Sequence, residues 1–267
     1  MAIKNVIFDL GKVLVDYDFN LFYEKIGYKP KSDEWDSNDE LILQFEMGKF
    51  PAEEFHKRMM KNFKLDLSFE EFKKAWCSIF PKTTPLVQFA SELVLQYDVY
   101  VFSNTDELHY PHVKKQFPEL NFIGENEMLS YELGAIKPDK VAFLKAIALF
   151  NLNPVDCLFI DDNIDNVAAA KKFGMDALLC SNPENCITEM KFLLENEKQE
   201  VFSPTKKQIK RKGLDRRQRE RRRKVIPVPI ERRKLDDRRS GGDRRRMKQE
   251  EKIPFLKKMV IDLFVKK

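Results

Sequence analysis

The chain has 267 residues, 43% of them hydrophobic and 34% charged, so it can bury the core of one large or two small domains. No run approaches the roughly 18 apolar residues of a membrane span, which predicts a protein without a transmembrane segment. The four cysteines are scattered and lack the spacing of a zinc or redox pair, which favours reduced thiols and a cytoplasmic location.

The formal net charge of +5 hides two parts of opposite sign. Residues 206–267 hold 26 Lys and Arg against nine Asp and Glu, whereas residues 1–205 hold 22 against 34. The net charges are therefore +17 and −12. This asymmetry predicts a boundary near Thr205, with an acidic folded part before it and a basic segment after it.

The chain opens with a short apolar run at residues 5–9, bounded by polar residues, which predicts a buried strand. From residue 19 to residue 80 the pattern changes to consecutive helices, expected at 39–47, 52–62 and 69–79. Ser68 and Glu71 have the spacing of a capping box. We therefore expect residues 19–80 to form a small helical cap, inserted after the first strand of the core.

Strands and helices alternate after residue 80. Short runs rich in Val, Ile, Phe and Leu predict further buried strands at 98–103, 156–161 and 176–180. Helical spacing predicts helices at 85–96, 106–116, 139–150 and 164–173. This alternation predicts an α/β fold, a doubly wound parallel sheet whose core comprises residues 1–18 and 81–200.

Residues 201–252 form a basic, low-complexity tail in which Arg-Arg pairs recur with acidic residues and glycine. Such a segment holds too few apolar groups to fold alone, so we expect it to be disordered. Residues 253–267 regain the spacing of a short amphipathic helix. The basic charge predicts an anionic partner, which is a nucleic acid, a membrane surface or an acidic protein, the chain's own acidic part included. The alternative is a solvated tail without a dedicated partner. The amphipathic segment favours the membrane or the protein.

Polar residues fall where a parallel sheet places its active site, beyond the carboxyl ends of the strands. They are Asp9, Ser103, Lys137 and an acidic cluster at 161–165. Each alone has a simpler explanation as a helix cap, a turn or a solvated side chain. Two carboxylates directly after a buried strand, Asp161 and Asp162, would however repel each other unless a cation lay beside them. Together these residues favour a site for a divalent cation over a helix N-terminus decorated with acids.

Four motifs resemble those of the haloacid dehalogenase superfamily: NVIFDLGKVLVD, VFSNTD, GAIKPD and LFIDDNIDNVAAAKKFG. The resemblance covers roughly residues 3–195, and the insertion at 19–80 is similar to the family's small helical cap. It implies a Rossmann-like core and a phosphatase with Mg²⁺ as its cofactor. The implied substrate is a small phosphomonoester, such as a sugar phosphate, which the cap would select.

The same resemblance implies the role of each site residue. Asp9 is the nucleophile that forms an aspartyl phosphate, and it holds Mg²⁺ together with the backbone carbonyl of Gly11. Asp162 is a further metal ligand, while Asp161 and Asp165 ligate the ion or order its water. The implied phosphate-binding residues are Leu10, Gly11, Ser103, Asn104 and Lys137, of which Lys137 also offsets the charge of the phosphoryl group and the carboxylates.

The sequence departs from the family pattern at Gly11, where related phosphatases carry an aspartate that acts as general acid and base. General acid-base help is worth about 10²- to 10⁴-fold in rate, so esters with poor leaving groups need a replacement. Asp16, Asp18 and Glu46 are candidates, and the sequence does not distinguish among them.

Two alternatives to the phosphatase follow from the same departure. Hydrolysis of a carbon–halogen bond through an ester on Asp9 needs no metal, so the acidic cluster disfavours it. A binding or regulatory protein with weak or lost catalysis, whose basic tail recruits the partner, would also tolerate Gly11. Retention of Asp9, Ser103, Lys137 and the acids at 161–165 favours the enzyme.

Overall fold

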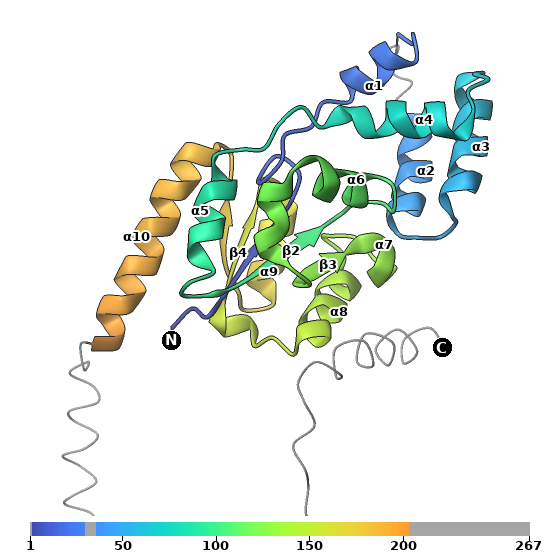
Figure 1. Cartoon of the computed structure of the whole chain (residues 1–267). Helices are drawn as coiled ribbons and strands as arrows, with labels where there is room; N and C mark the ends of the chain where they lie inside the picture. The colour runs from blue at the N-terminus through green and yellow to red at the C-terminus, as the bar shows by residue number, and fades with distance from the viewer. Residues whose placement is uncertain (1, 30–35, 203–267) are drawn as a thin grey trace, which may run out of the picture.

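A computed structural model describes residues 2–29 and 36–202, and its strands form one parallel sheet (Figure 1). The strand order is β3-β2-β1-β4-β5, so β1 lies in the centre between β2 and β4. The chain therefore leaves β1 where the strand order reverses, which is where open α/β sheets form a ligand crevice. The strands are β1 (Asn5–Phe8), β2 (Asp98–Ser103), β3 (Glu127–Leu129), β4 (Cys157–Asp161) and β5 (Asp176–Leu179).

Side chains of the central strands alternate between two apolar layers, as a sheet covered on both faces requires. Val6 and Phe8 join one core cluster, whereas Ile7 and Phe159 join the other. The first cluster includes residues of α5 (Leu86–Leu93), α6 (His109–Gln116) and α10 (Pro183–Phe202). The second includes residues of α7 (Ser130–Leu133), α8 (Lys140–Phe150) and α9 (Ile164–Lys172).

The helical cap lies between β1 and α5 along the chain, and it is packed around aromatic side chains. Phe45 and Phe55 stack with ring centroids 4.1 Å apart, and Phe55 meets Trp76 edge-on at 5.0 Å. The predicted capping box is present, because Ser68 and Glu71 each accept from the other's backbone N–H. The cap elements are α1 (Asn20–Lys25), α2 (Asp36–Glu46), α3 (Ala52–Phe63), α4 (Phe69–Trp76) and the short 3-10 helix η1 (Cys77–Ile79).

The turn between α2 and α3 docks on the core. The Ala52 N–H, at the start of α3, donates to Glu107 Oε1 at 2.6 Å. Gly48 has φ of +63°, and a Cβ added there would lie 2.3 Å from the Tyr131 carbonyl oxygen. The backbones of cap and core thus approach each other at a place where a side chain would not fit.

The structure confirms the α/β fold with its inserted helical cap, and it places each predicted strand within one residue of its expected bounds. Among the described strands and α-helices, it adds three that were not predicted from the sequence, β3, α7 and α10, together with the short 3-10 helices η2 (Pro118–Ile123) and η3 (Pro154–Asp156). None of the described helices is long and apolar enough to cross a membrane. The predicted tail at 201–252 and the amphipathic helix at 253–267 lie outside the described residues, apart from the last two residues of α10.

Candidate active site

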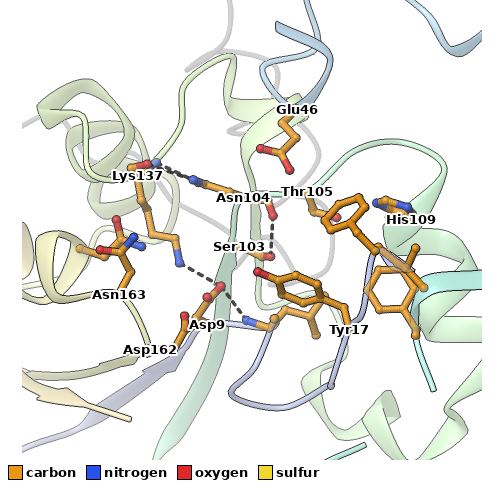
Figure 2. Close-up of a pocket in the computed structure, with 16 residues that line it drawn as sticks. Asp9, Tyr17, Glu46, Ser103, Asn104, Thr105, His109, Lys137, Asp162 and Asn163 are labelled. Carbon is orange, nitrogen blue, oxygen red and sulfur yellow. Dashed lines mark hydrogen bonds and ion pairs between the residues drawn. The ribbon is translucent and has the colours of Figure 1, made fainter. Parts of the chain in front are cut away.

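Asp9 follows β1 directly and lies at the carboxyl end of the sheet (Figure 2). Its backbone N–H extends the pairing of β1 and β4 by donating to the Ile160 carbonyl at 2.8 Å. Its Oδ1 accepts from the Leu10 N–H at 2.7 Å and lies 2.9 Å from the Lys137 ammonium. Oδ2 has no hydrogen-bond partner among the described residues, so it is the oxygen available to phosphorus or a cation.

Lys137 is 3% exposed and donates to three oxygens. These are the Phe102 carbonyl at 2.7 Å, Asp161 Oδ2 at 2.6 Å and Asp9 Oδ1. Burial alone would lower the pKa of Lys137, but the two carboxylates outweigh it and hold the pKa above its ordinary value. The Asn104 side chain makes two hydrogen bonds to the backbone of Lys137. Its amide NH₂ donates to the Lys137 carbonyl at 2.9 Å, and its amide oxygen accepts from the Lys137 N–H at 2.8 Å.

Asp161 ends β4 and is fully buried. Besides Lys137, its carboxylate accepts from the Asn163 N–H at 2.9 Å and from the Asn166 amide at 3.0 and 3.1 Å. These donors satisfy the buried carboxylate and hold it in one orientation. Asn166 was not predicted as a site residue, although it lies five residues after Asp161 in the DDNIDN run, in the first turn of α9.

Three carboxylates, those of Asp9, Asp161 and Asp162, offer ligand atoms within 4.8 Å of one another. Burial raises the pKa of Asp9 to about 7 despite Lys137, and Asp161 adds to the increase. Burial and Asp161 also raise the pKa of Asp162. One ammonium therefore does not balance three carboxylates, and this set of hard oxygen ligands fits a divalent cation.

A cavity of about 270 Å³ opens above these carboxylates. Ser103, 2% exposed at the end of β2, lines it with its hydroxyl. A cavity near the small end of the roughly 300–1,000 Å³ range of ligand pockets suits a small metabolite. The cavity brings together most of the predicted site residues: Asp9, Leu10, Gly11, Ser103, Asn104, Lys137 and Asp162.

Asp165 differs from the other predicted metal ligands in its position. It lies in the first turn of α9, exposed, with its N–H donating to Asn163 Oδ1 at 2.8 Å. It is not among the three carboxylates that converge. Its part in ordering metal-bound water stays a prediction.

The remaining wall of the cavity was not predicted from the sequence, except for Glu46, which was one of three candidate proton donors. A Cβ at Gly11 would lie 2.9 Å from Tyr17 Cε1, so the Tyr17 ring takes the space of a side chain at position 11. Glu46, at the end of α2, adds a carboxyl group from the cap. No spacing in the sequence indicates these neighbours, because the loop after β1 and the docking of the cap bring them in. The other lining residues that the sequence analysis did not assign are Phe19, Ile79, Phe80, Thr105, His109, Asn163 and Asn166.

Both ring nitrogens of His109 contact polar groups in the wall of the cavity. Nδ1 lies 2.9 Å from Asp106 Oδ2, and Nε2 lies 3.0 Å from the Trp76 carbonyl. Burial alone would lower the pKa of His109, but Asp106 outweighs it and raises the pKa above the ordinary value. Asp106 also accepts from the Trp76 indole at 3.1 Å, so this buried pair joins the core to α4 of the cap.

Comparison with known proteins identifies the family to which the chain belongs. The family model for haloacid dehalogenase-like hydrolases matches residues 3–174, which is more than half of the chain. The chain therefore belongs to the haloacid dehalogenase-like hydrolase family, and the prediction made from its motifs is confirmed.

Curated and solved relatives agree with this assignment. D-ribitol-5-phosphate phosphatase of Bacteroides thetaiotaomicron is 29% identical over 194 residues, 68% of this chain and 93% of that protein. An HAD family enzyme from the same organism, solved with magnesium and inorganic phosphate, is 28% identical with a TM-score of 0.61, covering 67% of this chain and 94% of its own. An HAD-like hydrolase from Porphyromonas gingivalis is 26% identical with a TM-score of 0.63, covering 73% and 98%.

L-2-haloacid dehalogenase from Xanthobacter autotrophicus is a more distant neighbour. It is 14% identical with a TM-score of 0.51, covering 66% of this chain and 76% of its own. At that identity the likeness shows the shared fold alone. It adds nothing to the carbon–halogen alternative.

Proposed function

We propose that this protein is a Mg²⁺-dependent phosphatase that hydrolyses a small phosphomonoester through an aspartyl phosphate on Asp9. The observation that carries the proposal is the open Oδ2 of Asp9, which faces a cavity beside two further carboxylates and a buried ammonium. Phosphoryl transfer needs an in-line nucleophile and neutralisation of the phosphoryl oxygens, and these groups supply both.

The residues that would hold Mg²⁺ are Asp9 and Asp162, together with the Gly11 carbonyl, and Asp161 and Asp165 would ligate the ion or order its water. When bound, the ion neutralises the phosphoryl oxygens and the excess carboxylate charge. In support, a solved relative is described as a complex with magnesium and inorganic phosphate.

Residues of the chain supply the nucleophile and bind the phosphoryl group. Asp9 Oδ2 attacks phosphorus, while the Lys137 ammonium orients Asp9 and opposes the rise of its pKa. We assign the binding of phosphoryl oxygens at the floor of the cavity to Ser103 Oγ and the Gly11 backbone N–H, because the Leu10 N–H already donates to Asp9 Oδ1. The Asn104 side chain is engaged with the Lys137 backbone, so we assign its phosphate contact to its own N–H.

We propose a sugar phosphate or a sugar-alcohol phosphate as the substrate class. In support, the curated relative is named for D-ribitol 5-phosphate, and the cavity of about 270 Å³ is small. Its polar wall, which includes Glu46, Thr105 and Asn163, suits the hydroxyl groups of such a substrate.

The test is hydrolysis of p-nitrophenyl phosphate and a panel of sugar and sugar-alcohol phosphates, with Mg²⁺ and with EDTA. We expect metal-dependent turnover by the wild type and none by Asp9→Asn. The amide oxygen of Asn can still accept from Leu10 and Lys137, so we expect the variant to keep its fold and its unfolding midpoint. Turnover by a folded Asp9→Asn protein at the wild-type rate would refute the mechanism.

We further propose that the basic segment after residue 205 recruits an anionic partner. The opposite net charges, +17 for residues 206–267 and −12 for residues 1–205, favour this second function. The partner class is a membrane surface, an acidic protein or a nucleic acid, with the first two favoured by the amphipathic pattern at 253–267. We place the protein in the cytoplasm, since all four cysteines are free thiols.

A further inference from the structure

The proposed phosphatase has glycine at position 11, so this position supplies no proton donor. Gly11 lies under the Tyr17 ring, which a Cβ would approach to 2.9 Å. The proton for the leaving oxygen therefore comes from another part of the cavity.

Transfer in line places the leaving oxygen on the far side of phosphorus from Asp9. Asp9 lies on the floor of the cavity, so the far side is the one that the cap covers. Glu46 reaches the cavity from the cap, at the end of α2, and Figure 2 shows its carboxyl group pointing inward on the side away from Asp9. Among the described residues it has no hydrogen-bond or ion-pair partner, so its carboxyl group is available to a substrate.

The two other acids that the sequence left open are engaged elsewhere. Asp16 lies 3.7 Å from the Lys82 ammonium, and Asp18 Oδ1 accepts from the Asn20 backbone and side chain at 2.9 Å. Neither lines the cavity.

His109 does line the cavity, but both of its ring nitrogens are occupied, by Asp106 and by the Trp76 carbonyl.

We propose that Glu46 is the general acid and base of the reaction, an inference that rests on the proposed phosphatase function. In the first step the bond from Asp9 Oδ2 to phosphorus forms and the ester P–O bond breaks. The leaving oxygen takes the Glu46 proton and departs as the alcohol. In the second step the oxygen of a water molecule bonds to phosphorus, and the water gives a proton to Glu46. The bond between Asp9 Oδ2 and phosphorus breaks, and inorganic phosphate leaves.

The charges around Glu46 support both roles. Burial raises its pKa to about 7, with Asp106 and Asp9 adding to the increase while His109 and Lys137 oppose it. A group that titrates near neutral pH can both donate and accept a proton at that pH. Tyr17 also lines the cavity, but burial raises the pKa of its phenol to about 12, so it cannot serve as the base.

The test compares Glu46→Gln with wild type and with Glu40→Gln, an exposed position on the same helix that hydrogen-bonds Gln44. All three are assayed with Mg²⁺ on two esters. D-ribitol 5-phosphate, or a faster alkyl phosphate of the panel, has a leaving group that needs a proton. p-Nitrophenyl phosphate has one that does not. Rapid mixing resolves the first turnover of the aryl ester.

For Glu46→Gln we expect kcat on the alkyl ester to fall about 10²- to 10⁴-fold, the usual worth of acid-base help. On the aryl ester we expect a burst of one p-nitrophenolate per active site at near the wild-type rate. A slow steady state then follows, because aspartyl phosphate accumulates without its base. Glu40→Gln behaves as wild type.

Equal losses on both esters without a burst would show that Glu46 only positions the substrate or the cap, and would overturn the proposal. Unchanged kinetics would also overturn it. A failure of the phosphatase function looks different, because wild type and Glu40→Gln would then hydrolyse neither ester.

Discussion

Lys137 is the residue whose removal separates stability from catalysis most clearly. Its ammonium compensates Asp161, which is fully buried, and Asp9. Losing one partner of a buried ion pair typically costs about 3–5 kcal/mol, because the other charge is left uncompensated. We expect Lys137→Met to lower the free energy of unfolding by about that amount in EDTA, measured by urea denaturation.

Mg²⁺ should recover part of this loss, since a bound cation takes over the compensation and binding to the native state adds stability. Turnover should stay low, because the phosphoryl oxygens lose their ammonium. Lys140→Met, at an exposed position that begins α8, is the matched control and should change neither quantity. A Lys137→Met protein as stable as wild type in EDTA would contradict this account of the site.

Asp106 and His109 make stability depend on pH in two directions. Burial would raise the pKa of Asp106, but His109 outweighs it and holds the pKa below its ordinary value. Stability from Asp106 is therefore present above about pH 3.9 and is lost as pH falls below it. The pKa of His109 is raised, so its contribution is complete below about pH 6.5 and is lost as pH rises through the raised value.

We expect His109→Gln to cost on the order of 1.5–3 kcal/mol at pH 5–6, where the charge-assisted bond is complete, and less at alkaline pH. Urea unfolding from pH 4 to 9 measures the difference. His112→Gln is the control, because His112 lies on the same helix and bonds only Gln116 among the described residues. A difference that grows with rising pH would have the wrong sign for this pair.

At the scale of elements, Gly48 decides how closely the cap approaches the core. A Cβ there would meet the Tyr131 carbonyl oxygen at 2.3 Å, whereas at Gly27, with nearly the same φ of +66°, it would meet nothing within 4 Å. The left-handed backbone alone makes alanine cost about 1–3 kcal/mol at either position, and the clash with Tyr131 adds to the cost at Gly48. We expect Gly48→Ala to raise the KM for the alkyl phosphate as well, because Glu46 lies two residues away at the end of α2.

Gly27→Ala isolates the backbone strain, so it should lose stability without any change in KM. Steady-state kinetics and denaturation of both variants check this. Equal KM values for the two would mean that the clash is absorbed without moving the cap.

The sequence predicted elements where a local pattern carried the information. Apolar runs located β1, β2, β4 and β5, and the capping box located the start of α4. β3 was not predicted because three residues at a sheet edge carry no periodicity. α10 was not predicted either, although Cys186, Met190 and Leu194 recur at helical spacing behind Pro183.

The site residues also fall into those that a local motif predicted and those that depend on the tertiary fold. Asp9, Lys137 and the 161–162 carboxylates follow strands or lie in recognisable motifs, and the fold brings them together. Tyr17 and Glu46 depend on how a loop and a cap helix fold over the sheet, which no spacing in the sequence encodes. The sequence named Glu46 only as one of three acids, and the engagement of the other two in the structure separates them.

At the scale of the whole molecule, the acidic and basic parts of the chain suit separate tasks. The described core and cap, up to Phe202, contain every residue that the proposed chemistry needs. The charge of +17 lies after residue 205. Catalysis and recruitment should therefore be separable by ending the chain at Thr205.

We expect the full chain to bind vesicles that contain phosphatidylserine at low salt, since each basic residue near such a surface contributes roughly 1 kcal/mol. Binding should weaken as salt screens the charges, and neutral phosphatidylcholine vesicles should not bind. The chain ending at Thr205 should bind neither vesicle yet keep the kcat and KM of the full chain. Co-sedimentation at several salt concentrations measures vesicle binding, and a phosphatase assay of both chains measures kcat and KM.

Salt-sensitive binding of RNA in place of vesicles would assign the tail to nucleic acid. Equal vesicle binding by both chains would show that the basic segment is not the anchor.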